Sequence, residues 1–189
     1  MDVVTGPLVA ATAGAGRTRD LAGALAGLCV PGDVVLLAGD LGAGKTTFAQ
    51  GFGRALGIVE AVTSPTFTLV RQYPVDPGPN RGLQWLIHAD VYRLDHLREI
   101  TDLGIGELVE DGGVALVEWG DAAAPVLGGD ALTVRLDAVV ADAGDDAVDA
   151  DGPAPGPDER RTLTVSAEGD RWADRWAALA AALSPWTAP

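Results

Sequence analysis

The sequence predicts an α/β fold in three layers, α/β/α, with a mixed and mostly parallel sheet. Residues 33–38 form a short apolar run rich in β-branched side chains, which is typical of a buried strand. Residues 39–46, GDLGAGKT, match the complete phosphate-binding pattern G-x-x-x-x-G-K-[ST], and residues 45–56 follow with apolar side chains on one helical face. A second apolar run at 114–117 indicates another buried strand. This order of strand, glycine loop and helix predicts a P-loop NTPase-like fold.

Two further elements are expected before the first strand. Residues 5–16 are small and glycine-rich, which predicts irregular structure. Residues 18–28 place leucine and alanine at helical spacing, which predicts a helix.

After the loop helix, the alternating residues 66–73 predict a strand, and residues 83–92 predict its partner across a proline-rich connection. Because these two strands look like a hairpin, the sheet should be mixed.

The C-terminal half continues the alternation of helices and strands. Residues 94–108 predict a helix that is interrupted at its glycines. Residues 131–136 and 161–166 alternate as a late antiparallel pair, and residues 171–183 predict a closing helix. We expect the tryptophans of this last helix to pack in the core, with a surface for a partner as the alternative.

The length of the chain favours a single domain spanning residues 1–189, since two full domains would be cramped. Eight acidic side chains and no basic one lie between Asp137 and Glu159, a stretch rich in Asp, Ala, Pro and Gly. Its composition predicts a disordered insertion at 137–159.

The formal net charge of −14 argues against direct binding to nucleic acid or to an anionic membrane, so any contact with RNA should be indirect.

Cysteine usage and hydropathy predict a cytoplasmic protein without a membrane segment. The single cysteine, Cys29, excludes an internal disulfide and any cysteine-rich metal site. We interpret Cys29 as a small apolar core residue, with a reactive thiol as the alternative. The sequence contains neither a long uninterrupted apolar span nor the charged start and apolar core of a signal peptide.

Lys45 is the only lysine of the chain, and every other cationic position is arginine. A compact ammonium at this place can reach the outer phosphates of a nucleotide, while the loop glycines let backbone amides turn toward them. Thr46 would place its hydroxyl on a magnesium ion. The alternative is a glycine-rich turn that binds nothing. Because an Asn-Lys-x-Asp guanine motif would need another lysine, ATP is favoured over GTP.

Two carboxylates are candidates for the chemistry. Glu118 ends the apolar strand at the place where P-loop enzymes put a magnesium-binding acid, or it is an ordinary surface glutamate. Strand period places His88, Asp90 and Tyr92 on one face. Asp90 could orient or deprotonate a water or order magnesium, with His88 and Tyr92 fixing its carboxylate by hydrogen bonds. The alternative is a solvent-facing stripe on an edge strand.

The segment Ser64-Pro65-Thr66 follows the loop helix, where many such enzymes carry a switch that senses the γ-phosphate. The hydroxyls of Ser64 and Thr66 suit that role, but a plain turn before a strand explains the same sequence pattern equally well.

Four blocks, at residues 39–47, 64–67, 88–94 and 117–119, together resemble the TsaE (YjeE) family of bacterial ATPases. They match in order and spacing across about residues 18–120. The resemblance implies a small P-loop fold and a magnesium-dependent ATPase that is required to form N6-threonylcarbamoyladenosine (t6A) in tRNA. In that family the ATPase joins TsaB and TsaD, TsaD transfers the threonylcarbamoyl group, and ATP hydrolysis resets the complex.

The matching motifs carry site residues over to this chain. The resemblance assigns Asp90 and Lys45 to catalysis, Thr46 and Glu118 to Mg2+, and Thr18 to the neighbourhood of the adenine. It also assigns binding of the ATP phosphates to Gly42, Ala43, Gly44, Lys45, Thr46 and Thr47. The family's acids before Thr18 are replaced here by Gly-Ala-Gly, and nothing carries over to the acidic insertion.

Two other functions fit the same loop. A P-loop kinase would move the γ-phosphoryl group onto a small molecule, but it usually has an arginine-dense lid, and the arginines here are scattered. A nucleotide-gated binding module would use ATP to switch conformation, with hydrolysis incidental. Slow ATP turnover that rises only with TsaB and TsaD would favour the ATPase.

Overall fold

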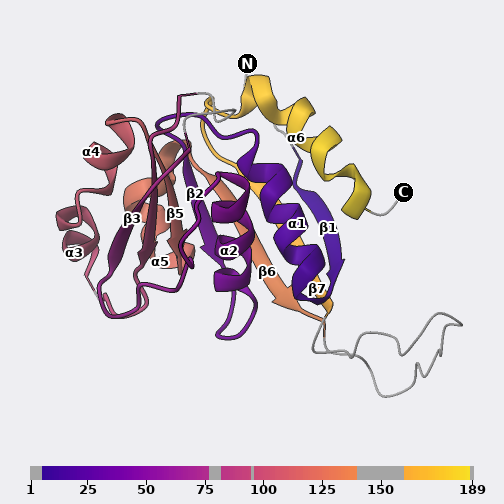
Figure 1. Ribbon diagram of the computed structural model, residues 1–189, viewed down its shortest axis with the longest axis horizontal. Coiled ribbons are helices and arrows are strands. Elements are labelled where there is room, and N and C mark those ends of the chain that lie inside the picture. Colours follow the sequence, from indigo (N-terminus) through magenta and orange to yellow (C-terminus); the bar gives the residue numbers. More distant parts are fainter. Residues whose placement is uncertain (1–5, 77–81, 95, 140–159, 188–189) are drawn as a thin grey trace, which may run out of the picture.

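The computed structural model describes residues 6–76, 82–94, 96–139 and 160–187, and their strands form one seven-stranded sheet (Figure 1). The spatial order is β1-β7-β6-β2-β5-β4-β3. The strands are β1 (Leu8–Ala13), β2 (Val34–Ala38), β3 (Val70–Pro74), β4 (Trp85–Asp90), β5 (Gly113–Glu118), β6 (Leu132–Ala138) and β7 (Arg160–Ala167).

The centre of the sheet is parallel and its two margins are antiparallel. Strands β6, β2, β5 and β4 run in the same direction. Strand β3 pairs antiparallel with β4, which confirms the predicted hairpin, and β7 pairs antiparallel with both β6 and β1. The mixed sheet with a parallel core is therefore confirmed. Its parallel strands direct their carboxyl ends to one edge, which is where ligands of open α/β sheets bind.

Helices cover both faces of the sheet, which gives the three predicted layers (Figure 1). One face packs against α1 (Gly14–Ala26), α2 (Lys45–Ala55) and α6 (Trp176–Leu183). The other packs against α3 (Leu97–Asp102), α4 (Ile105–Glu110) and α5 (Gly120–Leu127). Short 3-10 turns lie at η1 (Gly128–Asp130), η3 (Ala173–Arg175) and η4 (Ser184–Trp186). Because successive strand residues point to opposite faces, β2 supplies Val35 and Leu37 to the first layer and Leu36 to the second.

The N-terminal prediction was wrong. Residues 8–13 form β1 where irregular structure was expected, and α1 begins at Gly14 rather than at residue 18. In β1 only Ala10 and Thr12 are buried, and both are small, so the alternation carries little hydropathy contrast. The partner strand β7 follows about 150 residues later in the chain. No local pattern reveals such a pairing.

Other elements differ from the predicted ones in their boundaries; the closing helix, for example, begins at Trp176 rather than at residue 171. The strand predicted from residue 66 begins only at Val70, because the chain first turns through Leu69, whose φ is +65°. The helix predicted over 94–108 is split, as expected, at Gly104 in the left-handed conformation. Strand β6 runs to Ala138, into the segment expected to be an insertion, and Asp137 pairs with Thr162. The remaining part of that insertion, 140–159, lies outside the described residues.

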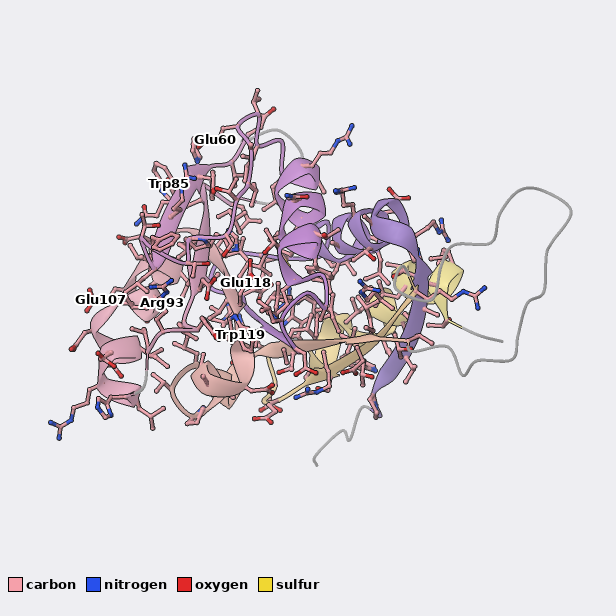
Figure 2. All side chains as sticks on the ribbon, turned by 90° about the horizontal axis from the view of Figure 1, so that it is seen from below. Glu60, Trp85, Arg93, Glu107, Glu118 and Trp119 are labelled. Atoms are coloured by element: carbon pink, nitrogen blue, oxygen red, sulfur yellow. The ribbon has the colours of Figure 1, made fainter. Side chains whose placement is uncertain are left out.

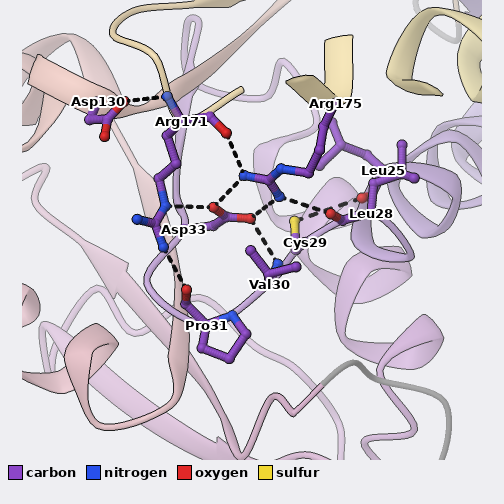
Figure 3. A network of polar contacts seen from close by, with 9 residues as sticks. All are labelled: Leu25, Leu28, Cys29, Val30, Pro31, Asp33, Asp130, Arg171 and Arg175. Carbon is purple, nitrogen blue, oxygen red and sulfur yellow. Dashed lines mark hydrogen bonds and ion pairs between the residues drawn. The ribbon is translucent and has the colours of Figure 1, made fainter. Parts of the chain in front are cut away.

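The C-terminal segment is fastened to the start of β2 through one buried carboxylate (Figure 3). Asp33 is fully buried and accepts hydrogen bonds from Arg171 Nε at 2.8 Å and from Arg175 Nη1 and Nη2 at 2.6 and 2.8 Å. The backbone N–H of Val30 donates to the same carboxylate at 2.8 Å. The hydrogen bond to Asp33 raises the pKa of Arg175 above its usual value.

The core interpretations of the sulfur and indole side chains are confirmed by burial. Cys29 is 2% exposed, and burial is the main cause that raises the pKa of its thiol well above the usual value. Trp172 is fully buried, and Trp176 packs against the same core cluster.

Candidate nucleotide-binding site

The glycine loop lies at the carboxyl edge of the parallel strands. Strand β2 ends at Ala38, and α2 begins at Lys45, so the loop fills the space between the sheet and the helix. Gly39, Gly42 and Gly44 have φ values of +126°, +80° and +106°. A Cβ on Gly39 would run into the backbone oxygen of Leu136, so this position requires glycine. The N-terminus of α2 has no side-chain cap, which leaves backbone amides available to an anion.

A cavity of about 410 Å³ opens beside the loop. Its lining comes from the glycine loop, the first turn of α2, the turn before β3 and the ends of β4 and β5. The lining residues are Leu41, Gly42, Gly44, Lys45, Thr46, Thr47, Ser64, Thr66, Asp90, Tyr92, Glu118 and Trp119. The structure thus brings together most of the site residues predicted from the sequence. Ala43 lines a second cavity on the other side of the loop.

Lys45 is held against its own loop. Its Nζ donates to the carbonyl oxygens of Gly39 and Asp40, both at 2.7 Å, and lies 3.9 Å from the centroid of the Trp119 ring. The side chain is largely buried, and this burial lowers the pKa of Lys45, although Glu118 and Asp90 act in the opposite direction. The ammonium is therefore a partly desolvated cation at the cavity wall, where phosphate oxygens would interact strongly with it.

Glu118 connects the sheet to the glycine loop. It is 3% exposed, so the alternative of an ordinary surface glutamate is wrong. The Thr46 hydroxyl lies 3.1 Å from both carboxylate oxygens, and His88 Nε2 lies 3.0 Å from Oε1. Figure 2 shows Glu118 next to Trp119 at the end of β5. Threonine and glutamate side chains in contact at this edge are a suitable pair for a magnesium ion.

Asp90 lies beside Glu118, opposite it in the β4–β5 register. Its Oδ2 accepts hydrogen bonds from Ser64 Oγ at 2.7 Å and Thr66 Oγ1 at 2.8 Å. Asp90 is 3% exposed and β4 lies between β5 and β3, so the alternative of a solvent-facing stripe on an edge strand is wrong. The turn before β3 thus places its two hydroxyls against the candidate catalytic acid.

The predicted support for Asp90 differs from the observed one. His88 contacts Glu118 instead of Asp90. Tyr92 supports Asp90 only through its backbone N–H, which donates to Oδ1 at 3.0 Å. Its ring packs on Trp119, with centroids 4.7 Å apart. The single-strand pattern missed this because each side chain of β4 can also reach the neighbouring strand.

Two residues escaped prediction as parts of the site. Trp119 contacts Lys45 and has a φ of +63°, a conformation that non-glycine residues rarely adopt. Arg161 donates through Nε to the carbonyl oxygen of Ala43 at 2.9 Å and lines the second cavity, of about 420 Å³. Trp119 follows Glu118 directly, which is a usable signal. Arg161 reaches the loop only through strand pairing, which no motif indicates.

Thr18, which the resemblance assigns to the neighbourhood of the adenine, is a buried residue of α1. Its side chain is 2% exposed, its hydroxyl is 2.8 Å from that of Thr12, and it also donates to the carbonyl oxygen of Gly14 at 3.3 Å. Thr18 lines neither cavity. Thr12 stands opposite Arg161 in the β1–β7 register, so Thr18 lies at the same end of the sheet as the glycine loop.

A metal ion at this site would need ligands beyond the protein. Among the described residues there is no group of three or more His, Cys, Asp or Glu side chains that could hold an ion. The Thr46 hydroxyl and the Glu118 carboxylate offer oxygen ligands, and Mg2+ commonly completes its shell with phosphates and water. The residues therefore fit a magnesium–nucleotide complex.

None of the helices in the described part of the chain is long and apolar enough to cross a membrane.

The fold and the glycine loop define a protein of the α/β class with a P-loop NTPase-like fold. The family model described as threonylcarbamoyl adenosine biosynthesis protein TsaE matches residues 12–143. The chain belongs to the TsaE family, a family of tRNA threonylcarbamoyladenosine biosynthesis proteins.

Individual relatives agree with this membership. The tRNA threonylcarbamoyladenosine biosynthesis protein TsaE of Streptomyces coelicolor is 41% identical over 157 residues, which cover 82% of this chain and 93% of that protein. The protein of the same name from Bacillus subtilis is 40% identical over 156 residues, covering 82% and 83%. The crystal structure of Bacillus subtilis YdiB is similar with a TM-score of 0.67 and 31% identity over 98% of both chains.

Proposed function

We propose that this chain is a magnesium-dependent ATPase that is required for t6A formation in tRNA. The observation that carries the proposal is the meeting of Lys45, Thr46, Asp90 and Glu118 in one cavity at the carboxyl edge of the parallel strands. The names of the relatives support a role in tRNA modification, and the complete glycine loop supports nucleotide binding.

Each residue has a role that follows from its surroundings. The backbone amides of residues 42–47 and the Lys45 ammonium bind the β- and γ-phosphates. Thr46 and Glu118 would hold magnesium, which would neutralise charge on the phosphate oxygens. Asp90, an acceptor of three hydrogen bonds from neighbouring groups, orients a water and takes its proton. The water oxygen bonds to the γ-phosphorus, the bond to the leaving ADP oxygen breaks, and ADP and phosphate are released.

The side of the loop that faces Thr18 is our proposed direction for the adenine. The second cavity lies there, lined by Asp40 and Arg161 among others. Because the hydroxyl of Thr18 is already bonded to Thr12 and Gly14, its influence on the base would be indirect.

The reaction served by this ATPase belongs to other proteins in the proposal. TsaB and TsaD are the proposed partners, and hydrolysis by this chain resets their complex between turnovers. The net charge of −14 favours contact with tRNA only through that complex, which would act in the cytoplasm.

A reconstituted modification assay tests the proposal. TsaB, TsaD and a donor of the threonylcarbamoyl group are mixed with tRNA, and t6A and phosphate are measured with and without this chain. Lys45→Ala should abolish tight ATP binding or turnover, and t6A formation should fall with it. Arg54→Ala, which removes an exposed cation from the other end of α2, should behave as wild type.

Two outcomes would contradict the proposal. Unchanged hydrolysis by Lys45→Ala would remove the phosphate-binding role of the loop. Stoichiometric phosphoryl transfer to a metabolite, with no effect on t6A, would favour the kinase.

A further inference from the structure

His88 is a completely buried imidazole that the proposed reaction does not use directly. Its exposed fraction is 0%, and it is absent from the lining of the nucleotide cavity. Its Cα stands opposite Leu116 in the β4–β5 register, two residues before Glu118 on the same face of the sheet. From there His88 reaches diagonally to Glu118, with Nε2 3.0 Å from Oε1.

The position of the ring hydrogen follows from these contacts. A carboxylate oxygen can only accept, so Nε2 carries the hydrogen that faces Glu118. The other nitrogen, Nδ1, is buried and has no hydrogen-bond partner in the described part of the chain. A hydrogen on Nδ1 would be a buried donor without an acceptor, which is more unfavourable than an unused lone pair. The imidazole is therefore a single donor directed at Glu118.

Glu118 needs such a donor because competing charges surround it. The Lys45 ammonium attracts it, and Asp90, opposite it in the register, repels it. The terminal torsion of a glutamate is broad, so the carboxylate can rotate unless hydrogen bonds prevent it. His88 holds Oε1 from the side of the sheet, while Thr46 contacts both oxygens from the side of the loop. Oε2, which His88 leaves free, faces the threonine.

We propose that His88 is a positioning residue: as the Nε2–H tautomer it fixes the Glu118 carboxylate in the orientation that binds magnesium beside Thr46. The proposal rests on the proposed function, since it assumes that Glu118 contacts the metal. It assigns His88 no contact with nucleotide or metal. Hydrogen-bond partners of metal-binding carboxylates commonly change metal affinity or activity by about 10- to 100-fold when they are replaced.

Three substitutions of His88 separate the donor from the packing. Glutamine places an amide N–H the same number of bonds from Cα as Nε2, asparagine places it one bond shorter, and leucine has no donor. Magnesium titrations of ATP hydrolysis should give half-saturation within about threefold of wild type for His88→Gln, and about 10- to 100-fold higher for His88→Asn and His88→Leu. ADP binding measured in EDTA should stay within about threefold for all three folded variants. Circular dichroism establishes which variants are folded.

Glu118→Ala distinguishes failure of this inference from failure of the proposed function. If Glu118→Ala loses its magnesium dependence while His88→Asn and His88→Leu match wild type, the positioning role is refuted and the ATPase stands. The same holds if His88→Gln is as impaired as His88→Leu. If Glu118→Ala itself titrates as wild type, the magnesium role of Glu118 is wrong, and the inference falls with it.

A spectroscopic measurement tests the tautomer without activity. The chain has two histidines, so His96→Gln leaves His88 as the only imidazole. Nitrogen-15 spectra of this variant should show the Nε2–H tautomer at neutral pH, and Glu118→Ala in the same background should change the Nε2–H signal. A hydrogen on Nδ1, or an Nε2–H signal indifferent to Glu118→Ala, would overturn the proposal.

Discussion

Replacing Asp33 by asparagine tests whether one buried carboxylate fastens the C-terminal segment to the core. In Asp33→Asn an amide N–H₂ replaces one acceptor oxygen and faces the donors of Arg175 and Val30. Two arginines that now share a full negative charge would share one neutral acceptor. The substitution therefore removes the ion pairs and also places an amide donor against the N–H donors of Arg175 and Val30.

The expected loss of stability follows from burial. Asp33 is 0% exposed, whereas the side chains of Arg171 and Arg175 are 33% and 17% exposed. Removing one partner of a fully buried ion pair costs about 3–5 kcal/mol, and an exposed pair is worth less than about 1 kcal/mol. Because the arginines stay partly hydrated, we expect the free energy of unfolding to fall by about 2–3 kcal/mol. For a chain of this length, the melting temperature should then fall by about 4–12 °C.

Calorimetry and urea denaturation measure this loss against a matched control. Asp121→Asn makes the same chemical change in the exposed pair with Arg135, where the two side chains are 61% and 45% exposed. Its effect should stay below about 1 kcal/mol. Asp33 precedes the first residue of β2, about 20 Å from the glycine loop along the strand, so ATP affinity at 25 °C should not change. Equal melting temperatures for the two variants would refute the reasoning.

Three further predictions concern the site and the thiol. Asp90→Asn should lower ATP hydrolysis about 10²- to 10⁴-fold in single-turnover assays while ADP affinity stays close to wild type, and equal rates would exclude Asp90 as the base. Arg161→Ala removes a hydrogen bond to Ala43 and should weaken ADP binding about 2- to 10-fold by calorimetry, with unchanged affinity as the contrary result. Cys29 should react with a thiol reagent only on unfolding. Burial raises the pKa of Cys29 in the folded state. The contribution of the thiol to stability is therefore complete below the ordinary thiol pKa of about 8.5 and is lost as the pH rises through the higher folded-state pKa. Urea denaturation at pH 8 and at pH 10 would measure this loss. Rapid labelling of folded protein would contradict the burial.

Contiguous patterns were enough to predict the central part of this protein. The glycine loop, the buried strands on either side of it and the acid at the end of β5 all follow from residues that are neighbours in the chain. Hydrophobic period depends on local backbone geometry, and a phosphate-binding loop needs its glycines and its lysine in a fixed order. The fold class and the positions of Lys45, Thr46 and Glu118 could therefore be read directly.

Other features depended on which strands became neighbours. β1 was missed because its small residues have little hydropathy contrast and its partner β7 is distant in the chain. The bond from His88 to Glu118 instead of Asp90 requires β4 to lie beside β5, and the contact of Arg161 with the loop requires β7 to lie beside β6. The hydrogen bonds from Arg171 and Arg175 to Asp33 join residues more than 130 positions apart. Such contacts are decided by tertiary structure because strand order, which no local pattern encodes, determines which side chains come within hydrogen-bond distance.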